Sequence, residues 1–211
     1  MKNKKIENII IAFIFIIYMV GLFGFLLDIN TSKFKSLTPL NLVLTTLAIF
    51  LINGKFSLKL LVASFIIFSL GLSIEIIGVE TGLLFGEYNY GETLGYKFKG
   101  VPLTIGLNWL FLSLATFSIA KSLFKKSVFA VIFASLLMVF LDYFVEPVAI
   151  NLDFWNWESV NIPIQNYIMW FLASIFMQAI LHLFNIKFST KAGCVIYSLQ
   201  LIFFIVLNLN L

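Results

Sequence analysis

Glu75-Ile-Ile-Gly-Val-Glu80 and Asp142-Tyr-Phe-Val-Glu146 place carboxylic acids inside two strongly apolar stretches of the chain. Each stretch is followed by the same series of motifs: an aromatic-Asn-aromatic triplet, an apolar-Pro-apolar triplet and a Trp seven residues after the proline. The first series is Tyr88-Asn-Tyr90, Val101-Pro-Leu103 and Trp109; the second is Trp155-Asn-Trp157, Ile162-Pro-Ile164 and Trp170. An ionisable side chain at the centre of a membrane helix costs about 2.5–3.5 kcal/mol. The repetition therefore predicts two pseudo-repeated helix hairpins whose acids are retained for chemistry or transport.

Long apolar runs dominate the chain, in which 61% of the residues are hydrophobic. The runs approach or exceed the roughly 20 residues that cross a bilayer as a helix, and they lack the alternation of a barrel strand. We therefore expect an all-α, polytopic membrane helix bundle forming a single integral-membrane domain over residues 1–211. The seven predicted spans are 6–27, 39–53, 57–79, 102–120, 127–146, 163–185 and 192–210.

All basic residues are lysines, and their distribution predicts the orientation of the bundle. With the N-terminus in the cytoplasm and the C-terminus outside, most lysines fall on the inner side, as the positive-inside rule requires. The inner ones are Lys2, Lys4, Lys5, Lys55, Lys59, Lys121, Lys125, Lys126, Lys187 and Lys191; the outer ones are Lys33, Lys35, Lys97 and Lys99. No basic patch interleaved with aromatics is present, so we expect no nucleic-acid partner.

Few residues suit a metal or cofactor site. The single cysteine, Cys194, excludes an intramolecular disulfide and a Cys-based metal site. We expect the single histidine, His182, to be packed or hydrogen-bonded, because it lies far from the acids along its span. The chain also lacks a GxGxxG fingerprint.

The acids are predicted to lie near the outer ends of their spans. Pro147 disfavours helical geometry at Glu146, so the fifth span is expected to end there. Asp142 then lies about 6 Å deeper on the same helix face. Glu75 has a similar depth in the third span, whereas Glu80 falls at or beyond the end of that span. If the two hairpins pair about an axis along the membrane normal, their acids face each other beneath the outer surface.

Glu75 and Asp142 are the strongest catalytic candidates. No lysine shares their depth and the chain has no arginine, so burial favours the neutral form of these acids. A neutral carboxylic acid is a proton donor suited to general acid catalysis. Glu80 and Glu146 either join such a site or face interfacial water. The remaining acids near these motifs are expected to be solvated loop charges: Glu87, Glu92, Asp153 and Glu158.

Aromatic residues gather toward the same side, where all four tryptophans of the chain fall. They form either an ordinary interfacial belt or a pocket whose rings stabilise a carbocation. Asn108 and Asn166 are candidates to orient water or a carboxyl group. The predicted substrate-binding residues are Tyr88, Tyr90, Trp109, Trp155, Trp157, Asn166 and Trp170.

Over about residues 70–172, these motifs resemble the integral-membrane carotenoid biosynthesis family, whose characterised members are hydratases of acyclic carotenoid ends such as bisanhydrobacterioruberin hydratase. Further motifs that carry the resemblance are Phe85-Gly-Glu, Leu94-Gly-Tyr, Pro147-Val-Ala149 and Gln165-Asn-Tyr167. The chain has Asp153 where the family pattern has Gly, and Gly106 where the pattern often has Pro. These departures concern a loop and a helix start, and not the acids.

The resemblance implies a reaction without a redox cofactor or a metal. A carboxylic acid, Asp142 or Glu75, protonates the terminal double bond of an acyclic carotenoid, and water adds to the tertiary cation. Glu146 and Glu80 would hold and deprotonate that water. The implied partners are a lipophilic acyclic carotenoid, water, the lipid bilayer and other enzymes of the carotenoid pathway. The implied location is the cytoplasmic membrane of a bacterium or archaeon.

Other functions predict different features. A membrane lycopene-type carotenoid cyclase shares the protonation step, but an internal double bond captures its cation. A small transporter of a lipid or a proton-coupled solute holds its acids at the midplane, often beside broken helices. A retinal receptor needs a lysine in the last span, and residues 192–210 contain none. A purely structural membrane protein would tolerate replacement of the acids.

Overall fold

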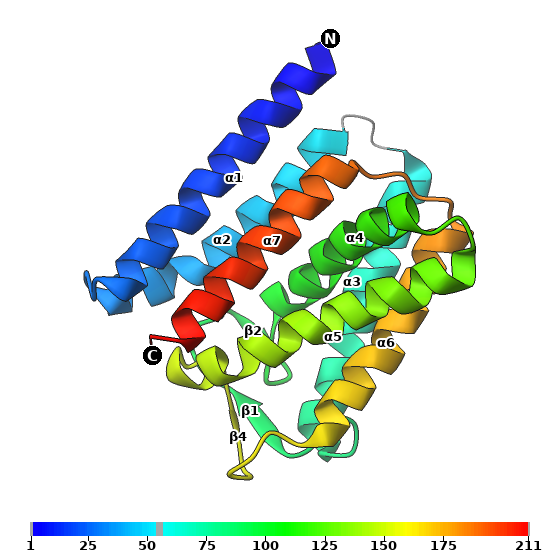
Figure 1. Ribbon diagram of the computed structural model, residues 1–211. Coiled ribbons are helices and arrows are strands. Elements are labelled where there is room, and N and C mark those ends of the chain that lie inside the picture. Colours follow the sequence, from blue (N-terminus) through cyan, green and yellow to red (C-terminus); the bar gives the residue numbers. More distant parts are fainter. Residues whose placement is uncertain (1, 54–56, 211) are drawn as a thin grey trace.

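The computed structural model describes residues 2–53 and 57–210, and most of them lie in helices (Figure 1). Seven of the helices in this part of the chain are long and apolar enough to cross a membrane, which confirms the predicted all-α bundle. They are α1 (Lys2–Leu26), α2 (Thr31–Asn53), α3 (Leu58–Thr81), α4 (Leu103–Leu123), α5 (Ser127–Asn151), α6 (Ile164–Leu183) and α7 (Thr190–Asn208). Lys55, which we predicted on the inner side, lies outside the described residues.

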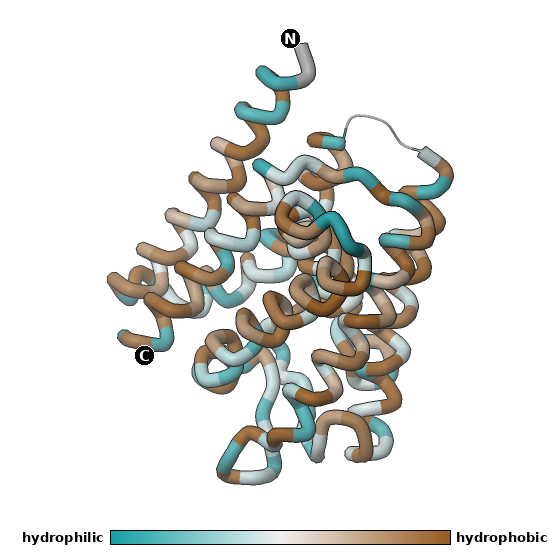
Figure 2. The backbone as a smooth tube through the Cα atoms, turned by 45° about the vertical axis from the view of Figure 1, so that its right-hand side comes forward, coloured by the Kyte–Doolittle hydropathy of each residue, from teal (hydrophilic) through white to brown (hydrophobic). Residues whose placement is uncertain are grey.

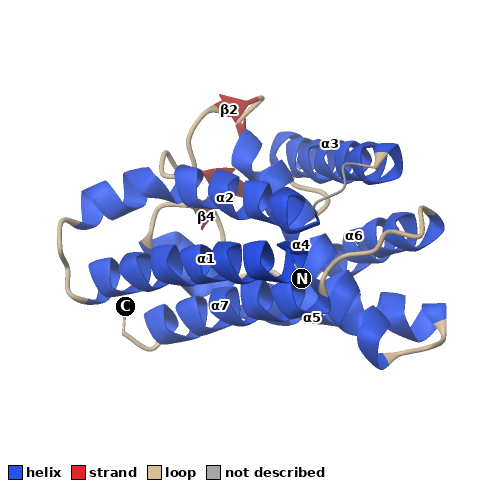
Figure 3. Cartoon of the chain, turned by 90° about the horizontal axis from the view of Figure 1, so that it is seen from above, coloured by secondary structure: helices blue, strands red, loops and turns tan. Residues whose placement is uncertain are grey.

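Helix α4 is the centre of the bundle. It packs against α2, α3, α5, α6 and α7 (Figure 3), and 78% of the residues in its most apolar stretch are buried. A helix that is apolar all round is expected in such a position. The helices around α4 expose large apolar side chains. Hydrophobic residues also make up most of the bundle in Figure 2. This surface is the one that meets lipid.

The outer helices fall into two groups around α4. Helices α1, α2 and α7 contact one another on one side, and α6 contacts both α3 and α5 on the other. The two ends of the chain lie at opposite ends of the bundle (Figure 1), as an odd number of crossings requires. The assignment of the N-terminal end to the cytoplasm stays a prediction.

Both hairpins begin their second helix directly after a proline. Pro102 and Pro163 precede α4 and α6 with nearly equal backbone angles, φ −63° and ψ 134° for one and φ −65° and ψ 135° for the other. A proline fits there because the first N–H groups of a helix have no intrahelical partner. The repeated apolar-Pro-apolar motif thus marks two equivalent helix starts.

Two predicted helix boundaries were wrong because prolines lie inside helices. Helix α2 begins at Thr31 rather than at 39 and contains Pro39, since the polar turns before the apolar run are also helical. Helix α5 continues through Pro147 to Asn151 rather than ending at Glu146. Membrane helices tolerate such prolines where nearby groups bond the released carbonyls. The acids of α5 therefore lie about one turn deeper in their helix than we predicted.

Four short strands form in the loops between α3 and α4 and between α5 and α6, where no strand was predicted. They are β1 (Tyr88–Tyr90), β2 (Lys97–Phe98), β3 (Val101–Pro102) and β4 (Trp155–Trp157). Strand β1 pairs antiparallel with β4, so the aromatic triplets of the two hairpins lie side by side. Along β1, Tyr88 and Tyr90 are buried and Asn89 is exposed. The triplets therefore direct their aromatic rings inward, toward the bundle.

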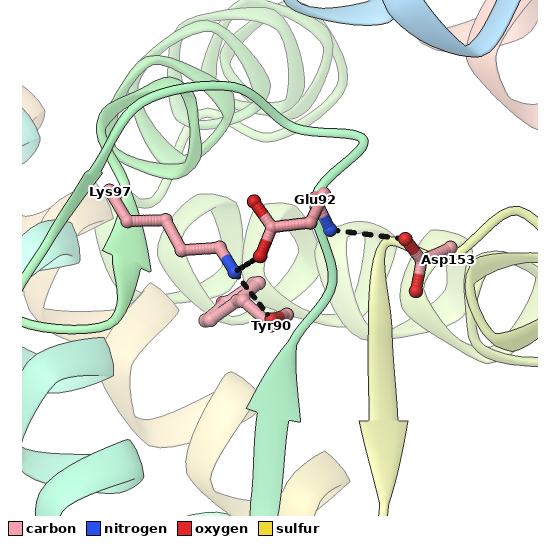
Figure 4. A network of polar contacts seen from close by, with 4 residues as sticks. All are labelled: Tyr90, Glu92, Lys97 and Asp153. Carbon is pink, nitrogen blue, oxygen red and sulfur yellow. Dashed lines mark hydrogen bonds and ion pairs between the residues drawn. The ribbon is translucent and has the colours of Figure 1, made fainter.

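Exposed polar contacts close the rim of this two-stranded sheet (Figure 4). The Lys97 ammonium lies 2.7 Å from a carboxylate oxygen of Glu92 and 2.8 Å from the backbone oxygen of Tyr90. The backbone N–H of Glu92 donates to the Asp153 carboxylate at 3.0 Å. Asp153 has a positive φ of 59°, a conformation that glycine adopts most readily. Asp153 thus occupies a glycine-like position and supplies a bond that glycine could not.

Candidate active site

Glu75, near the end of α3, is buried and accepts three side-chain hydrogen bonds. The hydroxyls of Tyr88 and Tyr90 donate to its Oε2 at 2.6 and 2.7 Å. The indole N–H of Trp109 donates to its Oε1 at 3.0 Å. The first hairpin therefore surrounds its acid with donors from its own strand and its own second helix.

Glu146, on α5, is bound in the same manner by the second hairpin. The indole N–H groups of Trp155 and Trp157 donate to its Oε2 at 3.0 and 2.8 Å. The amide of Asn166 donates to its Oε1 at 2.9 Å. The three N–H groups occupy acceptor sites of the Glu146 carboxylate, so this carboxyl group serves as a hydrogen-bond acceptor.

The two hairpins are related by an approximate two-fold axis. In the β1–β4 pair, Asn89 lies opposite Asn156, with Tyr88 opposite Trp157 and Tyr90 opposite Trp155. The structural equivalent of Glu75 is therefore Glu146. Our sequence comparison had instead matched Glu75 with Asp142 and Glu80 with Glu146, because it aligned the acids by their order.

Asp142 breaks this symmetry. It precedes Glu146 by four residues, and Gly71 occupies the corresponding place before Glu75. A side chain cannot fit at Gly71, where an added Cβ would lie 2.8 Å from the Trp109 ring. The second hairpin thus carries one buried acid more than the first.

The carboxyl group of Asp142 is only half engaged. Its Oδ2 accepts a bond from the Asn166 amide at 2.9 Å, and the same amide nitrogen bonds Glu146. Its Oδ1 is buried, and no residue that the structure describes bonds to it. The Asp142 side chain as a whole is 2% exposed. A buried oxygen without a hydrogen-bond partner fits the O–H group of a neutral carboxylic acid. The proton of that group is then available to a ligand.

An apolar cavity of about 270 Å³ leads to Asp142 from the lipid side. It lies between α4 and α5 on one side and α1, α2 and α7 on the other. Val20 of α1 and Leu40 of α2 line it and are also 56% and 51% exposed. The cavity therefore reaches the lipid-facing surface between α1 and α2.

A second, much smaller cavity of about 20 Å³ lies among the acids. Glu75, Glu146, Asn108 and Asn166 supply polar groups to its wall. A water molecule needs roughly 10–15 Å³ of such volume and two to four polar partners. The space is therefore the size of one water. It shares wall residues with the large cavity, among them Asn108 and Trp155.

Tyr88 and Tyr90 keep their protons in this site. Burial, and next the charge of the neighbouring Glu75 carboxyl, raise the pKa of both phenols above the ordinary tyrosine value. Both hydroxyls therefore stay donors toward Glu75 at any pH that the protein meets.

The predicted substrate-binding residues all lie around the acids. Most of them donate a hydrogen bond directly to an acid. Trp155 and Trp170 also line the large cavity. Glu80 does not join the cluster: its carboxylate is half exposed and lies 3.4 Å from the Lys99 ammonium. Glu75, and not Glu80, shares the wall of the small cavity with Glu146.

Four polar residues of the cavity wall were missed by the motif analysis: Tyr18, Thr38, Asn41 and Gln200. They lie in the outer helices, beyond the repeated motifs. The only signal in the sequence was their polarity within apolar spans, which does not tell a cavity wall from a helix contact.

Comparison with known proteins gives one match. No curated protein and no solved structure matches the chain. The family model described as carotenoid biosynthesis protein matches residues 37–210, which include α3 to α7 and every acid of the cluster. The chain therefore belongs to the carotenoid biosynthesis protein family.

Proposed function

We propose that the protein adds water to the terminal double bond of an acyclic carotenoid end group. The observation that carries the proposal is Asp142, which lines an apolar cavity and whose buried Oδ1 has no hydrogen-bond partner among the described residues. Membership of the family supports a role in carotenoid biosynthesis. The specific reaction is argued from the two cavities and the acids between them.

The large cavity suits a lipophilic substrate that enters from the bilayer. Its wall is mostly apolar, and it meets lipid between α1 and α2. A carotenoid dissolved in the membrane would slide one end inward to Asp142 and leave the rest of its polyene among lipid tails. The terminal isopropylidene group then lies beside the acid.

Protonation is the first chemical step. Asp142 gives its proton to the CH carbon of the terminal double bond, and the positive charge forms on the neighbouring carbon that bears two methyl groups. The rings of Trp155 and Trp170 line the cavity, where an aromatic face attracts a cation. Glu75, one of the three buried acids, lies nearby on the wall of the water-sized cavity.

Water capture completes the reaction. A water in the small cavity adds its oxygen to the tertiary cation and passes one proton to Glu146, whose three N–H donors support the negative carboxylate. Return of this proton to Asp142 restores the starting state. The net change is one alkene plus one water giving one tertiary alcohol, so no oxidant or reductant is consumed.

A lycopene-type cyclase is the second candidate because it needs the same proton donor. In a cyclase, an internal double bond of the same end group captures the cation, and a water beside the cation is a hazard. The water-sized cavity between Glu75 and Glu146 favours hydration over cyclisation.

Expression in cells that accumulate lycopene tests the proposal. Pigment extracts would be analysed by liquid chromatography and mass spectrometry, beside cells that express Asp142→Asn. We expect a product heavier by one water per reacted end, with the polyene absorption unchanged, from the wild-type protein only. An isomer of unchanged mass with a shifted spectrum would show the cyclase instead.

A further inference from the structure

Asn108 of α4 lies at the junction of the two cavities, where they share part of their walls. The described residues that line both cavities are Ile105, Asn108, Trp155 and Trp170. Ile105 is apolar, and the indole N–H of Trp155 already donates to Glu146. An indole offers only a donor, whereas an amide offers both a donor and an acceptor. Among these residues, only Asn108 can therefore both donate a side-chain hydrogen bond to a water at the junction and accept one from it.

The amide of Asn108 has no partner in the fold. No hydrogen bond joins it to any residue that the structure describes, although it is partly buried in a membrane helix. Ile105, Asn108 and Leu112 lie on one face of α4, and all three line the large cavity. A polar side chain inside the membrane is costly and faces the bundle interior or a functional cavity. The free groups of Asn108 therefore face space that a ligand or a water can occupy.

Asn108 also departs from the repeat of the two hairpins. The residue before the repeated tryptophan is Asn108 in the first hairpin and Met169 in the second. Asp142 is a similar departure, because Gly71 occupies its equivalent place. Both Asn108 and Asp142 line the large cavity. The pseudo-symmetry requires neither polar group, yet both lie where the reacting end of the substrate would lie.

The two carboxyl groups of the small cavity have little capacity left for water. A carboxylate offers about four acceptor sites. Glu75 accepts bonds from two phenols and one indole, and Glu146 accepts bonds from two indoles and one amide. About one site therefore remains on each acid. A water that uses both sites has both hydrogens engaged between the acids, so it needs another partner to reach the junction.

We propose that Asn108 positions the water that captures the cation, and thereby decides whether the cation is hydrated or loses its proton again. The inference rests on the proposed function. At the junction, the water donates one hydrogen to Glu146 and the other to the amide oxygen of Asn108. A lone pair of its oxygen then faces the large cavity and forms the C–O bond, while one proton passes to Glu146. Without the amide, the cation gives a proton to a carboxylate, and an alkene forms again with no water consumed.

A structural role of Asn108 makes a different prediction. Because its amide bonds no described residue, Asn108→Leu removes no hydrogen bond of the fold, and the melting temperature in detergent should not fall. A defect in folding or in protonation would lower all products by the same factor. A defect in water capture changes the share of cations that become alcohol.

Deuterium separates protonation from water capture. Membranes from lycopene-accumulating cells that contain the full-length protein would be suspended in D₂O, so that Asp142 delivers deuterium to the pigment. Deuterated alkene reports a cation that formed and lost a proton, and deuterated alcohol reports water capture. In Asn108→Leu, we expect the ratio of alcohol to deuterated alkene to fall about five- to tenfold, as loss of one net hydrogen bond implies. Deuterium should still enter the pigment.

Asn41→Leu is the matched control. Asn41 is also an amide on the wall of the large cavity, but it does not line the small cavity. Its replacement should leave the ratio of alcohol to deuterated alkene at the wild-type value, whatever its effect on the total rate. Asn108→Ser supplies a hydroxyl that can donate and accept, so it should recover part of the ratio that Asn108→Leu loses.

The outcomes distinguish this inference from the function on which it rests. An unchanged ratio in Asn108→Leu would overturn the role of Asn108 and keep the hydratase. An equal loss of alcohol and of deuterium uptake would also overturn it, because Asn108 would then act on protonation or on folding. If the wild-type protein formed neither alcohol nor deuterated alkene, the hydratase itself would be wrong.

Discussion

Trp109 stacks on Trp170 with ring centroids 4.0 Å apart and an angle of 20° between the ring planes. Each ring comes seven residues after the proline that precedes its helix, so equivalent residues of the two hairpins meet in this stack. Trp109 also bonds Glu75, and Trp170 lines both cavities. The stack therefore joins α4, whose Trp109 bonds Glu75, to the wall of the large cavity, which leads to Asp142.

Replacement of Asp142 by Asn should abolish most hydration. A general acid contributes about 100-fold to 10,000-fold to a rate, and an amide cannot supply its proton. The pigment assay in lycopene-accumulating cells measures this change, with immunodetection of the protein in the membrane fraction. Glu80→Gln is the control, because Glu80 is an exposed acid of the same hairpin system, and it should keep wild-type activity. Full activity of Asp142→Asn would remove the proposed mechanism.

Glu146→Gln should lower stability more than Asp142→Asn does. A Gln amide at position 146 turns hydrogens toward the indole and amide donors, so at least one buried donor loses its acceptor at a cost of about 1–3 kcal/mol. Asn at position 142 keeps an oxygen for Asn166 and places its amide where no described group bonds. Thermal unfolding in detergent checks the order of the two variants. Equal melting temperatures would show that the three donors do not depend on a carboxylate.

Gly71→Ala should impair the site through the tryptophan that packs there. The added Cβ would lie 2.8 Å from Trp109, and overpacking of this kind costs about 1–3 kcal/mol. Displacement of the ring also weakens its bond to Glu75. At Gly21, an added Cβ meets Phe203 at 3.6 Å, an ordinary contact, so Gly21→Ala serves as the control. The melting temperature should fall only in the Gly71 variant, and the pigment turnover of that variant should fall with it.

Water labelled with ¹⁸O should appear in the product of the wild-type protein. In the proposed reaction, the new hydroxyl oxygen comes from water, so the product mass rises by two units for each hydrated end in fully labelled water. A cyclase protonates the same bond but adds no oxygen. Mass spectrometry of the pigment distinguishes the two outcomes, and unlabelled oxygen in a hydrated product would point to a different source.

Hydropathy and motif order predict much of this molecule. The apolar runs predict the seven helices, because the length and hydropathy of a membrane span are local properties of the sequence. The repeated prolines give the starts of α4 and α6, and the repetition as a whole gives the pairing of the two hairpins. The gathering of acids and aromatic rings at one end of the bundle follows from these placements.

The partners of each acid depend on three-dimensional register, which no local pattern contains. The equivalence of Glu75 with Glu146 became visible only when β1 paired with β4. The continuation of α5 past Pro147 reflects packing in the bundle, which overrides the local preference for a helix end. The cavity wall at Tyr18 and Gln200 comes from two helices separated by most of the chain, so only the assembled bundle reveals it.

The β1–β4 pair has a consequence for how the protein is made. The strand partner of residues 88–90 is residues 155–157, which are synthesised after α4 and α5. Until that segment has been synthesised, the first hairpin lacks the strand that pairs with β1. Completion of the acid cluster is therefore a late event in biogenesis, and a ribosome stalled before β4 leaves a membrane protein without its site.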